Sequence, residues 1–250
     1  MAQEAERLGR ALAEGGEERW VRVLAGRAPG AGDLEDAAAL VHVVEGSEAT
    51  HEDQEAFRLA ARKDVPVVCI LVGSEPEAAT RVPYVLATDV ISVPPGQEVP
   101  VGDVVEHVAA QIGEKGYALA GKLPALRREV AETIVDRFAR QNAILGAAVF
   151  VPGADLPVMT LNQIRMVLRL AGAYGQEIDR ERAVELLGVV GAGIGFRAVA
   201  RQLVALVPVG GWAVKGGVGY AGTKALGEAA VRYFEAGGLE AARRSVRSRS

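Results

Sequence analysis

Residues 203–227 read LVALVPVGGWAVKGGVGYAGTKALG, a run that is apolar, rich in glycine and almost free of charge. A second run of the same character, AILGAAVFVPGADLPVM, covers residues 143–159. Such stretches must be covered by other helices or by lipid, because an apolar surface of this size aggregates in water. The two runs therefore predict a glycine-rich helical domain whose helices pack on one another or meet a membrane.

Length and composition allow one large domain or two ordinary ones. The chain has 250 residues, of which 50% are apolar and only 5% aromatic, so the core is built from small aliphatic side chains. Cys69 is the only cysteine, which excludes an internal disulfide and suits a reducing compartment. The N-terminus is charged and acidic, without the apolar region of a secretory signal. We therefore expect a cytoplasmic protein.

Charge is distributed unevenly along the chain. Residues 1–120 hold 10 basic and 21 acidic side chains, whereas residues 121–250 hold 18 basic and 11 acidic ones. Part of the basic surplus in residues 121–250 comes from an arginine-rich tail at residues 239–250, which we expect to be disordered. The asymmetry indicates two domains with different surroundings.

The first domain, residues 1–120, is predicted to be a small doubly wound α/β domain with a parallel sheet. Strands are expected at residues 20–24, 39–44, 66–72 and 89–93, after an acidic helix or frayed arm at residues 1–19. Thr50 is expected to cap a helix, because Asp53 follows it at capping-box spacing. Another helix is predicted over residues 103–115.

The second domain, residues 121–238, is predicted to be all helix. Leu126, Val130, Ile134 and Phe138 recur at intervals of four and mark one buried face. Breaks are expected at Pro152-Gly153 and again at Pro157. An amphipathic helix over 161–172, a helix over 180–187 capped by Asp179, and a closing helix over 224–236 should follow. Two glycine-rich runs, 188–195 and 208–222, separate the later helices.

One glycine pattern in this domain approaches a phosphate-binding loop. Gly217, Gly219 and Gly222 fit G-x-G-x-x-G, and Thr223 and Lys224 follow them in the reverse of the P-loop order. Too little chain remains after Lys224 for the strands and magnesium ligand of such a domain. Close helix contact through small residues is the favoured interpretation, with a phosphate loop as the alternative.

Catalytic constellations are not evident in the sequence. His42, His51 and His107 are scattered, and Cys69 falls inside an apolar strand where a thiol behaves as a small hydrophobe. Ser47 and Ser74 follow strands, but turn chemistry accounts for both. We expect no catalytic residue, metal or cofactor.

The region from about residue 125 to 238 resembles the bacterial family called domain of unknown function 697. The matching positions in order are Pro152, Gly153, Asp155, Gln163, Arg165, Met166, Tyr174, Gly175, Pro208, Gly210, Gly211, Gly219, Thr223 and Gly227. The family occurs in inner-membrane proteins and fused to GTPase domains. The resemblance implies membrane association and partnership with a GTPase, and it carries no catalytic residue to transfer.

Residues 39–112 resemble the latter half of a small GTPase domain. The position of the guanine-specifying motif reads Val-Gly-Ser-Glu at 72–75, so its asparagine and lysine are missing, and no P-loop precedes residue 39. The resemblance implies a truncated pseudo-GTPase fold without bound nucleotide. The alternative is a divergent GTP- or ATP-binding protein that uses residues 217–224 or the loops at 46–51 and 73–77.

Together these observations predict a non-catalytic accessory or scaffold protein. A spanning helix wants about 20 apolar residues, and the longest charge-free run here, 141–154, has 14. Packed helices are therefore expected, with peripheral attachment to the inner membrane as the rival interpretation. Candidate partners are a GTPase or other protein, an anionic membrane surface and a second copy of the chain. Nucleic acid is not expected, because no aromatic side chain accompanies the basic tail.

Overall fold

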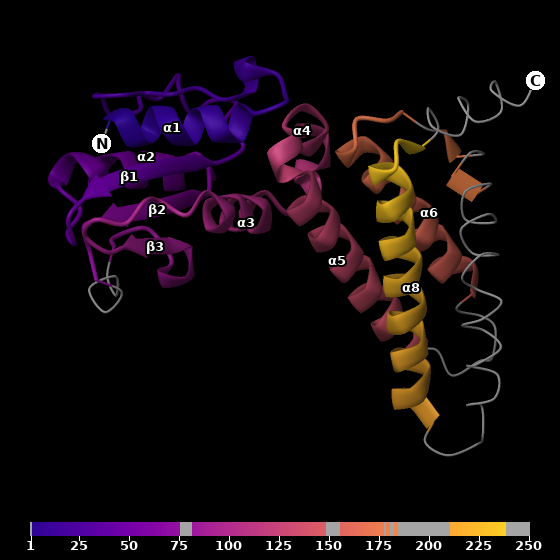
Figure 1. The fold of residues 1–250 in the computed structure, drawn as a ribbon. Helices are drawn as coiled ribbons and strands as arrows, with labels where there is room; N and C mark the ends of the chain where they lie inside the picture. Colours follow the sequence, from indigo (N-terminus) through magenta and orange to yellow (C-terminus); the bar gives the residue numbers. More distant parts are fainter. Residues whose placement is uncertain are drawn as a thin grey trace, which may run out of the picture. The chain divides into compact units, whose positions relative to one another are not determined.

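The computed structural model describes residues 2–75, 82–148, 156–177, 179–180, 183–184 and 211–238 (Figure 1). The chain divides into two compact units, Met1–Glu129 and Val130–Ser250. This division falls later than residue 121, because helix α4 (Tyr117–Lys122) and the turn η5 (Pro124–Leu126) belong to the first unit. In that unit η5 contacts α1 (Ala2–Ala13), α3 (Val101–Ile112) and α4.

The first unit is built on a sheet of three parallel strands. Its order is β1–β2–β3, and the strands are β1 (Leu40–Glu45), β2 (Val67–Val72) and β3 (Val90–Val93). Short turns η1 (Glu18–Trp20), η3 (Ala87–Asp89) and η4 (Gly113–Gly116) connect the elements. Three of the four strands expected from the sequence are therefore present, and each of their ends lies within one residue of the expected position.

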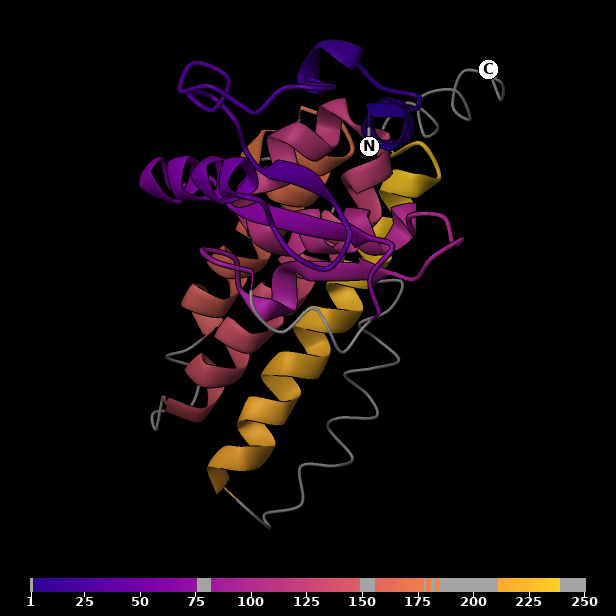
Figure 2. The same ribbon diagram turned by 90° about the vertical axis from the view of Figure 1, so that its left-hand side faces the viewer.

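Helices cover both faces of the central strand. One core cluster joins β2 to helix α2 (His51–Arg62) and includes Phe57, Ala60, Val67, Cys69 and Leu71. Because successive strand side chains point to opposite faces, Val68 and Ile70 face the other way, and both are fully buried. Helix α3 packs on β2 and also contacts α1. Figure 2 shows this unit turned by 90°.

The capping box predicted at Thr50 is confirmed. The Asp53 backbone N–H donates to Thr50 Oγ1 at 3.3 Å, and the Thr50 backbone N–H donates to Asp53 Oδ2 at 2.8 Å. Two amides that the helix would leave without partners are thereby satisfied. The box fixes the start of α2 at the residue that the sequence indicated.

The strand predicted at residues 20–24 is wrong. Trp20 ends the turn η1, and the extended residues after it pair with no strand among the described residues. Val23 instead packs against α1, where its side chain occupies the space that a Cβ on Gly9 would need. The extended, β-branched segment after Trp20 therefore packs against a helix and does not join the sheet.

The second unit contains three long helices, α5 (Arg127–Ala148), α6 (Leu156–Ala173) and α8 (Gly211–Glu235). The predicted buried face of α5 is confirmed, since Val130, Ile134 and Phe138 are at most 3% exposed. The break expected at Pro157 is wrong, because a proline fits the first turn of a helix, where its missing N–H costs nothing. The closing helix begins at Gly211 and includes residues 211–222 of the glycine-rich run that precedes Lys224; residues 208–210 and the other run, 188–195, lie outside the described residues.

Candidate functional site

Three polar side chains meet inside the second unit, one from each of its long helices. Asn142 Nδ2 in α5 donates to Thr223 Oγ1 in α8 at 2.9 Å, and Asn162 Nδ2 in α6 donates to Asn142 Oδ1 at 3.0 Å. Asn142 and Thr223 are fully buried, and Asn162 is nearly so. Burying such groups is costly unless they are hydrogen-bonded, so the helices are held in the one register that pairs them. We call these three residues the polar node.

Two glycines bring α8 close to its neighbours. A Cβ on Gly219 would lie 2.7 Å from the backbone oxygen of Asn142, and one on Gly227 would lie 2.6 Å from both methyl groups of Val135. Because glycine has no side chain, the backbone of α8 can approach α5 this closely at both positions. Gly217 and Gly222 have nothing within 4 Å of the same position. Helix contact therefore accounts for two of the four glycines.

The five residues of the alternative phosphate loop all lie inside α8. A P-loop offers the backbone N–H groups of a loop to phosphate, whereas helical N–H groups bond to carbonyls four residues earlier. The Thr223 hydroxyl belongs to the polar node, and Lys224 Nζ forms an ion pair with Asp136 of α5. Hydrogen bonding to that carboxylate raises the pKa of Lys224. Within the described residues, 217–224 thus form a packing surface instead of a loop.

Tyr174 and Gly175 end α6 and connect it to α8. Gly175 adopts a φ of +70°, and the Gln176 N–H donates to the Ala171 carbonyl at 2.8 Å, as in a glycine-ended helix. The Tyr174 ring stacks on Phe234 with centroids 6.0 Å apart, and its hydroxyl donates to Glu235 Oε1 at 3.2 Å. These contacts fasten the two helices at their carboxyl ends.

Other positions of the family resemblance have varied placements. Met166 is fully buried in α6, Arg165 is exposed on the same helix, and Gly211 is the first residue of α8. Gln163, also in α6, is partly buried, more than Arg165 and less than Met166. Five further positions lie outside the described residues: Pro152, Gly153, Asp155, Pro208 and Gly210.

The opposite end of these helices carries exposed apolar side chains. Met159 and Asn142 both lie beside Gly219, so the first turn of α6, the last two turns of α5 and the third turn of α8 lie at one level. At that level the side chains of Ile144, Val158, Val218 and Tyr220 are 69%, 47%, 41% and 36% exposed. We call these four residues the apolar end. It also follows that α6 and α8 run parallel to each other and antiparallel to α5.

In the first unit a histidine joins the capping box of α2. His42 Nε2 lies 2.7 Å from Asp53 Oδ1, and the His42 ring meets Phe57 edge-on with centroids 5.0 Å apart. An ionised carboxylate only accepts hydrogen bonds, so the ring donates. Burial alone would raise the pKa of Asp53, but the bonds from His42 and Thr50 hold that pKa below its ordinary value.

This network predicts an acid-sensitive contribution to stability. A carboxyl whose pKa is lowered by folding stabilises the protein above its unfolded pKa, near 3.8, and the stabilisation is lost as pH falls through the folded value. We expect Asp53→Asn to lower the urea midpoint at pH 7 and to flatten its decline between pH 5 and about 2. The exposed Glu48→Gln is the matched control, and equal declines in the two variants would contradict the assignment.

The remaining candidate groups of the first unit are buried or hydrogen-bonded, except Ser47. Burial raises the pKa of the Cys69 thiol to about 12, which leaves it protonated and unreactive. Ser74, in the loop after β2, is 1% exposed and its hydroxyl donates to the Glu75 carbonyl at 3.3 Å. Ser47, after β1, is exposed. His107 Nδ1 lies 2.7 Å from the Asp103 carbonyl, within one helical turn.

Asn142 and Asn162 were missed by the sequence-based prediction, although one signal was present. Asn142 is the next step of the series Leu126, Val130, Ile134, Phe138. A polar residue at a position that continues an apolar stripe needs a buried partner. The partner itself is not visible in sequence, because Thr223 lies 81 residues away.

Comparison with known proteins gives one match. A family model described as "Domain of unknown function (DUF697)" matches residues 111–247, which include the polar node and the apolar end. No curated protein and no solved structure matches the chain. The match does not reach the three-stranded sheet, so its likeness to a GTPase domain stays a prediction. No described helix is both long and apolar enough to cross a bilayer.

Proposed function

Because the chain belongs to the family described as domain of unknown function 697, we propose that it is a non-catalytic accessory protein that attaches peripherally to an anionic membrane. The observation that carries this proposal is the apolar end, four large side chains held at one level by three packed helices. Exposed apolar side chains gathered at one level of a helical unit, on an otherwise charged protein, favour an interface.

Magnitudes indicate what kind of attachment these side chains support. Burying a large apolar side chain fully is worth about 1.5–3 kcal/mol. The four half-exposed side chains of the apolar end therefore contribute roughly 4 kcal/mol to membrane binding. A single myristoyl chain contributes about 5.5 kcal/mol and binds only marginally. Basic side chains near anionic headgroups add about 1 kcal/mol each, and the half of the chain from residue 121 has a basic surplus. Reversible binding that depends on anionic lipid is therefore expected.

The non-catalytic part of the proposal is supported by the partners of the groups that could perform chemistry. The Cys69 thiol is buried, Thr223 is hydrogen-bonded in the polar node, and Lys224 is paired with Asp136. Among the described residues no group of three or more His, Cys, Asp or Glu side chains could hold a metal ion. Each singled-out group thus stabilises the fold.

Vesicle flotation tests the membrane part directly. We expect the full chain to float with anionic vesicles more than with neutral ones, and the pair Ile144→Ser and Val158→Ser to reduce flotation about tenfold or more. The matched control pair is Tyr84→Ser and Leu86→Ser, at 61% and 69% exposure in the first unit.

Two outcomes would contradict the membrane proposal. One is no flotation with either kind of vesicle, which would leave a GTPase or another protein as the partner of the apolar end. The other is an equal loss in both variant pairs, because general surface apolarity and not this end would then cause binding. Vesicles of pure lipid keep protein partners out of the measurement.

A further inference from the structure

A shallow groove runs along the solvent-facing side of α2 in the first unit. The loop at residues 28–29 forms one wall, and the helix forms the other. Its lining includes four aliphatic side chains, which we call its floor: Ala28, Pro29, Ala56 and Leu59. Charged side chains of α2 form its rim, so the groove combines an apolar floor with defined charges.

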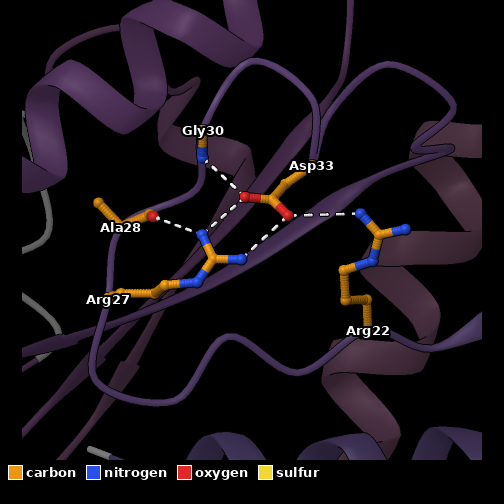
Figure 3. A network of polar contacts seen from close by, with 5 residues as sticks. All are labelled: Arg22, Arg27, Ala28, Gly30 and Asp33. Carbon is orange, nitrogen blue, oxygen red and sulfur yellow. Dashed lines mark hydrogen bonds and ion pairs between the residues drawn. The ribbon is translucent and has the colours of Figure 1, made fainter.

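The loop that forms the outer wall is held in place by one carboxylate (Figure 3). Arg27 donates to both oxygens of Asp33, at 2.7 and 3.0 Å, and Arg22 donates to one of them at 3.3 Å. The Gly30 backbone N–H also donates to Asp33, at 2.9 Å. The Arg27 guanidinium, followed by the Gly30 N–H, holds the pKa of Asp33 well below its usual range. A partner therefore meets a preformed wall and pays little ordering entropy.

The charges along the groove have opposite signs at its two ends. Glu52 lies in the first turn of α2 and Arg62 in its last turn, about 15 Å apart at 1.5 Å per residue. Both are exposed. Between them Glu55 and Arg58 form an ion pair within the helix. The groove thus carries one acidic end, one basic end and a neutralised middle.

We propose that this groove binds a second copy of the chain, with α2 antiparallel to α2 of the partner subunit. A surface that is acidic at one end and basic at the other is complementary to itself after a two-fold rotation. Glu52 then faces Arg62 of the partner subunit, and Arg62 faces Glu52 of the partner subunit. Each copy's α2 then lies over the aliphatic lining of the other copy's groove. This interface lies in the first unit and does not depend on the membrane proposal.

The expected association is weak and sensitive to salt. Exposed ion pairs contribute up to about 1 kcal/mol each, and the small aliphatic floor adds burial at about 25 cal/mol per Å². The same charges also complement the helix dipole of α2 within one chain. A charge-swap experiment distinguishes pairing between two copies from interaction with the helix dipole within one chain. Only in a dimer can one charge variant compensate for another.

Sedimentation velocity of the full chain over a concentration series at low salt tests the proposal. We expect a sedimentation coefficient that rises with concentration and falls with added salt. Glu52→Arg alone and Arg62→Glu alone should each abolish that rise, because like charges then meet at both ends. An equimolar mixture of the two variants should restore it, because one copy now carries two arginines and the other two glutamates.

Several results would overturn the interface. Wild-type protein that stays monomeric at high concentration would do so, and so would variants that associate as the wild type does. Loss in both variants without recovery in the mixture would also overturn it, provided that thermal melting shows both variants to be folded. The exchange Lys63→Glu, at an exposed position next to Arg62 but outside the groove lining, is the matched control and should leave the rise in place.

Discussion

Gly219→Ala will destabilise the second unit by about 1 kcal/mol net, although alanine is the better helix former. The new methyl group would lie 2.7 Å from the backbone oxygen of Asn142 and 3.0 Å from Met159 Cε. A methionine can rotate away, but a backbone carbonyl in the middle of α5 cannot. Overpacking of this kind costs about 1–3 kcal/mol and occasionally more, which outweighs the gain in helix propensity of about 1 kcal/mol.

Gly222→Ala is the matched control in the same helix. Its Cβ would meet no atom within 4 Å, so alanine should stabilise the protein by about 0.5–1 kcal/mol. Urea unfolding followed by circular dichroism measures both midpoints at unchanged slope. The two variants should move in opposite directions. If Gly219→Ala were as stable as Gly222→Ala, the close approach of α8 to α5 would be refuted.

Asn142→Ala is expected to destabilise the second unit strongly, with a loss of about 3–5 kcal/mol. It leaves the Thr223 hydroxyl and the Asn162 amide without the partners that they now have, at about 1–3 kcal/mol each. It also opens a small cavity in a packed interior. The same urea experiment measures the loss.

A double-mutant cycle assigns that loss to the node. Thr223→Val and Asn142→Ala together should cost less than the sum of the single changes, since the second substitution removes a group that the first has already orphaned. Asn162→Ala, at the less buried end of the node, should cost about 1 kcal/mol. Strict additivity of Asn142 and Thr223 would show that their hydrogen bond does not contribute.

Local signals in the sequence were sufficient for most of the fold. The capping box at Thr50, the apolar run at β2 and the four-residue spacing on α5 each depend on neighbours within one element, and each is confirmed. The strand predicted at residues 20–24 failed because its partner is a notch at Gly9 on a helix, which depends on tertiary packing. α8 was predicted too short because glycine disfavours helices, and the contacts at Gly219 and Gly227 offset that preference.

The candidate site was only partly accessible from the sequence. Gly219, Thr223 and Gly227 were singled out from the sequence as members of one pattern, and the structure places all three on α8. Their partners on α5 could not be paired with them, because no local rule connects residues some 80 positions apart. The exposure of Ile144 was equally hidden, since it depends on how the other helices pack against α5.

The burial of Cys69 has a practical consequence for studying this chain. It is the sole sulfhydryl, it is fully covered by the sheet and α2, and its proton is firmly held. Maleimide or nitroxide reagents require an accessible thiolate. A cysteine introduced at an exposed position such as Ile144 or Arg62 would therefore be modified alone, without prior removal of the native one. Probes attached in this way report the environment of the chosen position against a silent background.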